Sequence, residues 1–456
     1  MEYKHYPYHA LEDINLSRKS GTHNREFLEK ELQDKGMKAV TVCFSDIEGR
    51  FHALDYDKKY FLQNSGSLTF DGSSIRGFTD QAESDLILGI DWTSWYALPS
   101  DVFAPGKMLV FGHILNQDGT PYEADIRTKL GHLLYGMMDK KVHVSCEIEG
   151  FLFEGVNAEK SFNDAREFKF ATYGGYFDTL PRSILREFID KCGEVQRAMG
   201  FENEKDHGEV ACSQFEMNWK YTDALIAADQ IQLYKLICRQ VAANMGCTAS
   251  FLPKPVVGVN GNGMHTNISI ASSDTNLFYE ENGLHDGLSP LAQNFINGIL
   301  GRAEDLCLIM NSSVNSYRRL DPDYEAPNAI FSSSIDRGAM IRIPLANEKS
   351  TRIEVRSVAP DANPYLLLYS LIRAGTEGSF PASNRRQLPD NIYLALKHFK
   401  NSEFITKILG EDVKSKYAKW KQASADRCAK LLGTRIKAGE VMFHHEVTNQ
   451  HLWQLF

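Results

Sequence analysis

Acidic side chains embedded in an apolar strand are the first candidates for chemistry in this sequence. The segment 141–153, KVHVSCEIEGFLF, alternates apolar residues with a polar row that includes Glu147 and Glu149. Side chains two positions apart on a strand point to the same face, so these carboxylates lie side by side and repel each other unless a cation joins them. A lone Glu-x-Glu pair is usually a solvated sheet edge, but the apolar setting favours a cation site here.

A glycine-rich loop leads into a second strand with a polar face. In KPVVGVNGNGMHTNIS (254–269) an Asn-Gly-Asn-Gly stretch directly precedes His265, Asn267 and Ser269, which share one face. Glycines let backbone N–H groups approach an anionic ligand closely, and the strand then presents an imidazole, an amide and a hydroxyl in a row. An ordinary hairpin with one polar face is the commoner explanation of one such segment. Its recurrence along this chain favours a ligand site.

A second pair of glutamates needs a turn before it can act together. Glu209 and Glu216, in HGEVACSQFEMNW, are seven positions apart and would face opposite sides of an ideal strand. Both reach one site only if a bulge or turn intervenes, and we expect it at 212–214. From the residues alone, two solvated surface carboxylates are an equally good interpretation.

Arginines alternate with β-branched residues further along the chain. In RIEVRS, Arg352, Glu354 and Arg356 share one face while the residues between them are Ile and Val. Surface arginines are usually solvated charges, but this alternation indicates half-buried strands whose polar face lines a cleft. The upstream residues that extend the set are Arg319, Glu325, Arg337 and Arg342.

These segments together predict a metal site of hard ligands beside positive charge. Carboxylate oxygens favour Mg²⁺ or Mn²⁺ over zinc, which prefers cysteine and histidine. Carboxylate-held metals next to arginines suit a polyphosphate, because both neutralise charge as a phosphoryl group is transferred. No G-x-x-x-x-G-K-[ST] sequence occurs, which argues against a P-loop nucleotidase.

Composition narrows the class of protein. The chain has 456 residues, of which 43% are hydrophobic and 24% charged, as expected for a globular protein with room for two domains. Its net charge of −9 gives no support to binding of nucleic acid or an anionic membrane. No apolar run approaches the ~18 residues that span a bilayer, and the polar N-terminus is unlike a signal peptide. The eight cysteines are scattered without a C-x-x-C pair, which indicates reduced core thiols and a cytoplasmic location.

The order of elements predicts a small α+β domain followed by a large one. A helical stretch near 23–36 precedes two alternating strands that flank a turn at 46–49, which is typical of a β-hairpin. The polar, turn-rich segment 116–125 marks the expected domain boundary. Beyond it, helical stretches such as 223–245 alternate with the polar-faced strands.

Six motifs, taken in order, closely resemble those of the glutamine synthetase family. They are FDGSSIRGF with AESDL downstream, the EIE strand, EVACSQFE, KPVVGVNGNGMHTNIS, NSYRRLDPDYEAP and RIEVRSVAPDANPYL, and beyond Tyr369 the match is loose. The resemblance implies a helical segment at 1–36, a β-grasp-like domain at 37–117 and a catalytic domain at 118–456 with a curved antiparallel sheet and flanking helices. It also implies a ring-shaped homo-oligomer, a dodecamer, whose active sites are shared between neighbouring subunits.

The resemblance also implies a role for each candidate residue. One metal is expected on Glu149, Glu209 and Glu216. The other metal is expected on Glu147, His265 and Glu354. Glutamate is expected on Asn260, Gly261, Arg319 and Arg356. ATP and its phosphates are expected on Asn267, Ser269, Arg342, Arg352 and the catalytic Arg337.

The implied reaction has two steps. ATP phosphorylates the γ-carboxylate of glutamate, and ammonia then displaces phosphate. Ammonium must first lose a proton, because the protonated form is no nucleophile. Asp71 of a neighbouring subunit is implied as the base, and Glu325 is implied on a flap that excludes water. The cation pocket around the ammonium is completed by Ser74, Tyr176, Glu209 and Glu325.

Two other readings remain open. A γ-glutamyl ligase for another amine, such as methylamine, ethanolamine or a polyamine, could use the same scaffold, but retention of the whole cation pocket favours ammonia. A catalytically silent member is disfavoured because all six metal positions are present. Gly208 departs from the pattern by replacing a second histidine before Glu209.

Regulation by adenylylation is not expected. Some members carry an acceptor tyrosine in a loop reading roughly N-L-Y-D-L-P, and the nearest stretch here, NRRQLP, has Arg386 at that place. Tyr393 lies in the helix-like NIYLALKHF, where Ile392, Leu394 and Leu396 suggest that it is packed.

Overall fold

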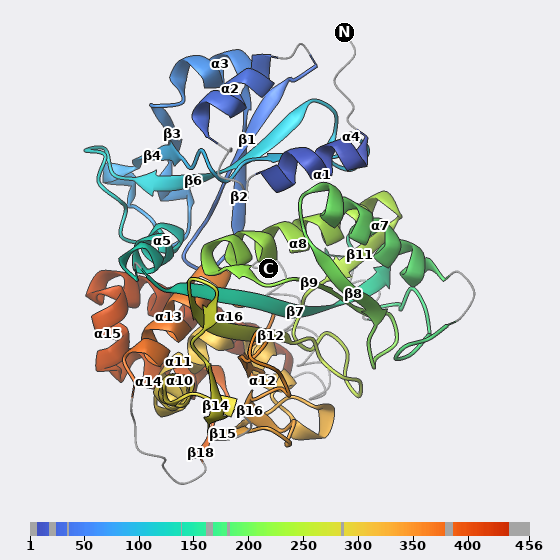
Figure 1. Cartoon of the computed structure of the whole chain (residues 1–456), viewed down its shortest axis with the longest axis vertical. Coiled ribbons are helices and arrows are strands. Elements are labelled where there is room, and N and C mark those ends of the chain that lie inside the picture. Colours follow the sequence, from blue (N-terminus) through green and yellow to red (C-terminus); the bar gives the residue numbers. More distant parts are fainter. Residues whose placement is uncertain are drawn as a thin grey trace.

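The computed structural model describes residues 7–17, 24–33, 36–137, 139–160, 167–179, 183–283, 287–378 and 386–436. The N-terminal β-grasp domain, blue to cyan in Figure 1, lies against one side of the larger part that the family resemblance implies is catalytic, called the catalytic part below. Helices α1 (Tyr8–Leu16) and α2 (Arg25–Gln33) precede it. Among the described residues, no helix is long and apolar enough to cross a bilayer.

The β-grasp domain is a six-stranded sheet in the order β2-β1-β6-β4-β3, with β5 paired to β6. Its strands are β1 (Ala39–Ser45), β2 (Phe51–Asp57), β3 (Leu68–Asp71), β4 (Asp85–Ile90), β5 (Tyr96–Ala97) and β6 (Lys107–Leu115), with helices α3 (Lys58–Asn64) and α4 (Ser100–Phe103) between them. The expected hairpin is confirmed, because β1 and β2 pair antiparallel from Ala39↔Asp57 to Ser45↔Phe51. Gly49 turns it with φ +89°, and a Cβ there would lie 2.6 Å from Asn363 Cα. The glycine therefore lets the hairpin turn press against the catalytic part.

The catalytic part is built on an eleven-stranded curved sheet in the order β18-β15-β16-β17-β12-β7-β9-β8, with β10 and β11 paired to β7 and β13 to β12. All its pairs are antiparallel except β15 with β16. Its strands are β7 (Lys141–Glu154), β8 (Asn203–Gly208), β9 (Gln214–Trp219), β10 (Thr222–Asp223), β11 (Cys247–Ser250), β12 (Met264–Ser272), β13 (Thr275–Asn276), β15 (Ala329–Ser333), β16 (Ala339–Arg342), β17 (Ile353–Val355) and β18 (Arg386–Gln387), and β14 (Tyr279–Gly283) lies outside it.

Helices flank this sheet, and those after residue 290 gather at the lower left of Figure 1. The helices that follow the β-grasp domain are α5 (Ile126–Gly136), α7 (Ile184–Ala198), α8 (Ala224–Asn244), α10 (Pro290–Gly301), α11 (Ala303–Met310), α12 (Val314–Arg319), α13 (Pro364–Thr376), α14 (Ile392–Asn401), α15 (Glu403–Leu409) and α16 (Glu411–Ile436). The helix expected over 223–245 is α8, which is capped by Asp223 and followed by Gly246 at φ +74°.

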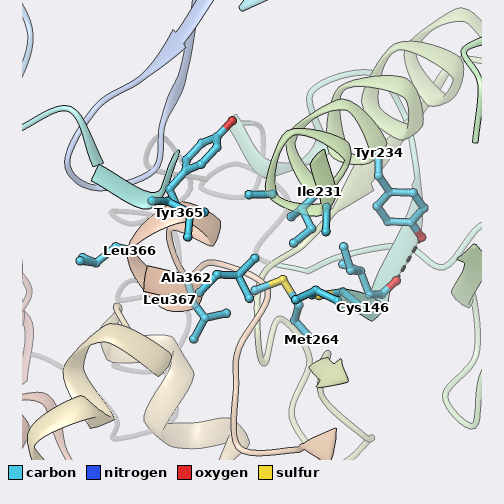
Figure 2. Close-up of a cluster of buried hydrophobic side chains, with 14 of the residues drawn as sticks. Cys146, Ile231, Tyr234, Met264, Ala362, Tyr365, Leu366 and Leu367 are labelled. Carbon is cyan, nitrogen blue, oxygen red and sulfur yellow. Dashed lines mark hydrogen bonds between the residues drawn. The ribbon is translucent and has the colours of Figure 1, made fainter. Parts of the chain in front are cut away.

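One part of the core lies between α8, α13 and the apolar face of the sheet, and the same buried cluster continues into the β-grasp domain. Figure 2 shows Ile231 of α8 above Met264 of β12, with Tyr234 of α8 to their right and Tyr365 of α13 to their left. Tyr234 is fully buried, and its hydroxyl donates a hydrogen bond to the Ile148 carbonyl at 3.0 Å. Helix α8 is therefore anchored directly to the strand that carries the first two candidate glutamates.

Two expectations about side-chain burial can be checked. The seven described cysteines are free thiols, and all but Cys212 are buried, as the composition indicated. The packing expected for Tyr393 is wrong: its side chain is 45% exposed, while Ile392 and Leu396 are 2% exposed. A helix repeats every 3.6 residues, so the face that buries Ile392 and Leu396 turns Tyr393 toward solvent.

Candidate active site

The glutamates of β7 lie on one face of the large sheet, as their spacing predicted. Residues of β7 alternate in burial from Lys141 to Gly150. Glu147 lies opposite His265 of β12, and Glu149 lies opposite Glu216 of β9. Strands β12 and β9, which pair with β7 on either side, therefore place their polar side chains next to Glu147 and Glu149 on the same face of the sheet.

One cluster combines Glu147, His265 and Glu354. Their potential ligand atoms lie within 4.8 Å of one another. Strand β12 pairs with β7 on one side and with β17 on the other, which brings together residues far apart in the sequence. His265 Nδ1 lies 3.4 Å from Glu147 Oε2 and 3.6 Å from Glu354 Oε1. The set expected for one of the two metals is thus assembled in the fold.

Glu354 is the most deeply buried member of this cluster and pairs with two arginines. Its side chain is 1% exposed, and its two carboxylate oxygens accept hydrogen bonds from Arg356 Nη1 at 2.6 Å and Arg342 Nη1 at 2.9 Å. Burial acts to raise the pKa of Glu147, but the hydrogen bond from His265 and its charge outweigh it and lower that pKa to about 2. This cluster is already balanced by positive groups of the protein.

A second cluster combines His207, Glu209 and Glu216, again with potential ligand atoms within 4.8 Å of one another. The turn expected near 212–214 is present: Ser213 has φ +60°, and Glu209 N donates to Gln214 O at 2.8 Å. Strands β8 and β9 form a hairpin in which His207 pairs with Glu216. Both glutamates therefore reach the same side of the sheet, and His207, two positions before Glu209, joins them.

Glu149 lies beside this second cluster but faces a different partner. Its Oε2 accepts a hydrogen bond from Gly263 N at 2.7 Å, and Gln214 Nε2 lies 3.4 Å away. The second cluster thus contains His207, whereas the family resemblance implied Glu149 as the third ligand beside Glu209 and Glu216. Glu149 remains close enough for its charge to act on both neighbouring glutamates.

Electrostatics distinguish the second cluster from the first. Burial, and then the negative charges of Glu149 and Glu216, raise the pKa of Glu209 to about 8. Burial and the charges of Glu149 and Glu147 raise the pKa of Glu216 to about 8 as well. Carboxyl groups in this state gain strongly from a bound cation, because it relieves both burial and repulsion.

Both clusters open into one polar cavity of about 240 Å³. The predicted site residues that line it, besides those of the clusters and Glu149, are Tyr176, Asn260, Gly261, Arg319, Glu325, Arg337, Arg342 and Arg356. Lys205 and Tyr324 also line it, and no pattern in the sequence singled them out.

Arg319 carries unused hydrogen-bonding capacity at this cavity. Its side chain is 3% exposed, and Nη2 donates to the Arg356 carbonyl at 3.0 Å. Nη1 has no hydrogen-bond partner among the described residues. Burial lowers the pKa of Arg319 to about 10, so it stays charged at neutral pH. A buried, charged and incompletely bonded guanidinium is suited to an anionic ligand.

The loop before β12 and the segment after α12 meet across the cavity. Asn260 Nδ2 donates to Glu325 Oε2 at 3.0 Å. Glu325 itself adopts φ +61°, a left-handed conformation uncommon for glutamate. The segment that carries Glu325 is therefore held over the cavity by a side-chain contact.

The polar row continues beyond the clusters along β12. Asn267 Nδ2 donates to Glu147 Oε1 at 3.2 Å, and Arg352 Nε donates to Asn267 Oδ1 at 3.0 Å. Ser269 pairs with His143 of β7, whose ring lies 5.0 Å from that of Tyr221. The sequence did not single out Tyr221 because it lies between β9 and β10, outside any strand periodicity.

Asp71 and Ser74 lie outside this cavity. Asp71 ends β3 in the β-grasp domain, where its exposed carboxylate accepts hydrogen bonds from Ser73 Oγ at 2.6 Å and Ser74 Oγ at 2.5 Å. Neither residue lines the cavity of its own subunit.

Comparison with known proteins gives a consistent family. The model "Glutamine synthetase, beta-Grasp domain" matches residues 36–117, and "Glutamine synthetase, catalytic domain" matches residues 134–433. Glutamine synthetase of Clostridium saccharobutylicum is 33% identical over 419 residues, covering 87% of this chain and 93% of that protein. Glutamine synthetase of Staphylococcus aureus is 34% identical over 443 residues, covering 89% and 95%.

Solved structures resemble most of the chain. A GmaS/ADP complex has a TM-score of 0.78 at 26% identity and covers 88% of this chain and 96% of that one. Plasmodium falciparum glutamine synthetase has a TM-score of 0.79 at 22% identity, covering 94% and 98%, which supports the shared fold.

Proposed function

The chain belongs to the glutamine synthetase family, and we propose that it ligates ammonia to the γ-carboxylate of glutamate with ATP, giving glutamine, ADP and phosphate. The observation that carries this proposal is a single cavity onto which both clusters of potential metal ligands and several arginines open. We further propose the domain division 1–36, 37–117 and 118–456, a cytoplasmic location and a ring-shaped homo-oligomer, with a dodecamer expected.

The donor atoms fit hard divalent cations. Carboxylate oxygens dominate both clusters, with one imidazole in each, and such a set suits Mg²⁺ or Mn²⁺. Glu147, His265 and Glu354 would hold one ion. Glu209 and Glu216 would hold another with Glu149, as the family pattern implies, or with His207, as the geometry suggests. Bound ions would neutralise phosphate charge during transfer.

The arginines divide the remaining cavity between two substrates. The unused Nη1 of Arg319, together with Arg356, Asn260 and Gly261, supports a site for the glutamate carboxylates. Arg337 and Arg342, with Arg352, Asn267 and Ser269 beyond them, support a site for the phosphates. The ring pair of His143 and Tyr221 lies past Ser269, where a purine base could stack on Tyr221, which is 49% exposed.

In the first step a γ-carboxylate oxygen of glutamate attacks the terminal phosphorus of ATP, and ADP leaves. Arg337 offsets the negative charge of the phosphoryl group in flight. In the second step ammonia attacks the acyl carbon, and phosphate leaves with the electron pair of the broken C–O bond. Glu325 covers the intermediate and limits hydrolysis.

The amine site combines residues of two subunits in this proposal. Tyr176, Glu209 and Glu325 line the cavity and would surround an ammonium ion. Asp71, exposed at the edge of its own subunit, would reach the cavity of a neighbour with Ser74 and take the proton that ammonium must lose.

A substituted amine is the second candidate substrate. A separate cavity of about 270 Å³ lies on the other side of His207 and is lined by Gly175, Phe177, Leu185 and Gly208. A Cβ on Gly208 would lie 3.6 Å from Leu185 Cδ2, so a side chain at this position would point toward that space. The glycine therefore leaves room near the amine site for a larger substituent.

The deciding experiment measures ADP release with glutamate and ATP in the presence of ammonium, methylamine, ethanolamine or putrescine, with mass spectrometry of the products. Ammonium should give the highest kcat/KM and yield glutamine. Preference for a substituted amine would replace ammonia by the second candidate. If ADP release depended on glutamate but none of the four amines increased it or appeared in a product, both candidate functions would be contradicted.

A further inference from the structure

Helix α16 connects the catalytic part to the loop that follows Asp71. Lys421 Nζ lies 3.0 Å from Glu48 Oε1 at the β1–β2 turn, and both side chains are 2% exposed. The Arg76 guanidinium lies over the Trp420 ring, 5.5 Å from its centre. Neighbouring residues of one helix thus contact two successive parts of the β-grasp domain.

The loop 72–79 is pressed between the hairpin turn and this helix. A Cβ on Gly77 would lie 2.6 Å from Ile47 Cγ2 and 3.4 Å from Trp420, and Gly77 has φ +78°. Phe78 is 4% exposed and packs edge-on against Tyr122 with ring centres 5.4 Å apart. The C-terminal end of the loop is therefore fixed on three sides.

The N-terminal end of the loop is fixed by the sheet. Asp71 is the last residue of β3 and pairs with Asp85 of β4. Ser74 lies between these two fixed ends, whereas Asp71 forms the first of them, and both side chains are exposed. The Ser74 hydroxyl donates a hydrogen bond to the Asp71 carboxylate at 2.5 Å, so a displaced loop would reach that carboxylate through Ser74. The orientation of both side chains then depends on how the far end of the loop is held.

The buried ion pair between Lys421 and Glu48 makes any separation of α16 from the β1–β2 turn unfavourable. A buried ion pair stabilises little relative to an apolar pair, but removal of one partner leaves an uncompensated buried charge and is costly. The pair also joins the turn that carries Ile47, against which Gly77 packs. A shift of the helix end would therefore reach the loop through both Trp420 and the turn.

We propose that Trp420 and Lys421 are positioning residues for the amine site: they hold loop 72–79 so that Asp71 and Ser74 project correctly toward the neighbouring subunit. This inference rests on the proposed function, in which those two residues complete the ammonium pocket. Displacement of a reacting group by about 1 Å can change rates by orders of magnitude.

The test compares Trp420→Leu, Lys421→Met and Arg76→Met with the matched control Lys419→Met, an exposed lysine on the same helix. The first three should raise KM for ammonium about tenfold or more, with little change in KM for glutamate or ATP. Trp420→Tyr keeps an aromatic face for Arg76 and should restore most of the lost affinity. Lys419→Met should leave all three constants unchanged.

A double-mutant cycle separates positioning from general destabilisation. Arg76→Met and Trp420→Leu together should raise KM for ammonium no more than Trp420→Leu alone, because the second change already removes the contact that the first one breaks. Arg76 lies at the surface end of that contact, so its variant should fold even where a helix variant does not. Equal changes in all three KM values, unchanged KM for ammonium in Arg76→Met, or full additivity would overturn the inference. Failure of the wild type to use ammonium would refute the proposed function instead.

Discussion

Divalent-cation binding at the second cluster should strengthen steeply with pH. Burial and neighbouring carboxylates raise the pKa of both Glu209 and Glu216 to about 8. At pH 6.5 these groups hold protons, whereas a metal ligand must be a carboxylate. Cation binding therefore has to expel protons, and a higher pH makes that easier.

The magnitude follows from the two pKa values. Loss of one proton from a group with a pKa of about 8 increases the apparent affinity about 8-fold between pH 6.5 and 7.5. Loss of two protons gives about 60-fold. The two groups titrate as a pair, so the measured value should fall between these limits. Glu147, whose pKa is about 2, has no proton to release in this range.

The same shift sets the stability of the metal-free protein. The folded pKa of each glutamate is raised above its ordinary value of 4.5. Their contribution to stability is therefore fully present below about pH 4.5 and is lost as the pH rises through about 8. Added Mn²⁺ should raise the unfolding temperature more at pH 8 than at pH 6.

Calorimetric titration with Mn²⁺ in two buffers of different ionisation enthalpy counts the protons released per ion. The control is Glu216→Gln, which lacks one titrating group and should release fewer protons and show a shallower pH dependence than the wild type. The comparison isolates the carboxyl protons from any released by histidine ligands. Equal affinity at pH 6.5 and 7.5, or equal proton release by both proteins, would refute the reasoning.

Four further outcomes are expected. Both Glu216→Gln and Glu354→Gln should abolish turnover. Without metal at pH 8 the first should raise the unfolding free energy, whereas the second should lower it by about 3 kcal/mol because it removes the negative charge that pairs with buried Arg356; chemical denaturation distinguishes them. Asp71→Asn should raise KM for ammonium at least about tenfold while sparing formation of γ-glutamyl phosphate; parallel loss of glutamate and ammonium affinity would count against it as the base. Tyr221→Ala should raise KM for ATP about 5- to 150-fold through lost stacking, and steady-state kinetics with unchanged KM would exclude a base site there. Adenylyltransferase and labelled ATP should leave the protein unlabelled and active, since Arg386 pairs with Glu304 and cannot accept the group; stoichiometric tyrosine labelling with loss of activity would show otherwise.

The amino-acid sequence by itself determined the local parts of this site. Strand alternation placed Glu147 and Glu149 on one face, because a period of two depends only on the backbone of one strand. The turn between Glu209 and Glu216 was equally local. In both cases the structure agrees with the expectation. The packing expected of Tyr393 was wrong because apolar neighbours in the sequence do not by themselves place a residue on the buried face of a helix, where burial follows a period of 3.6.

Only the tertiary structure decided which of these parts meet. Strand β12 lies between β7 and β17, so Glu147, His265 and Glu354 converge from three segments whose pairing no local pattern encodes. The place of His207 in the second cluster depends on the hairpin register, and the turning of Glu149 toward Gly263 depends on the approach of the glycine-rich loop. The contact of α16 with the loop after Asp71 joins segments that lie more than 300 residues apart in the sequence. Such contacts arise from the burial of whole faces against each other, which the sequence of any single segment cannot specify.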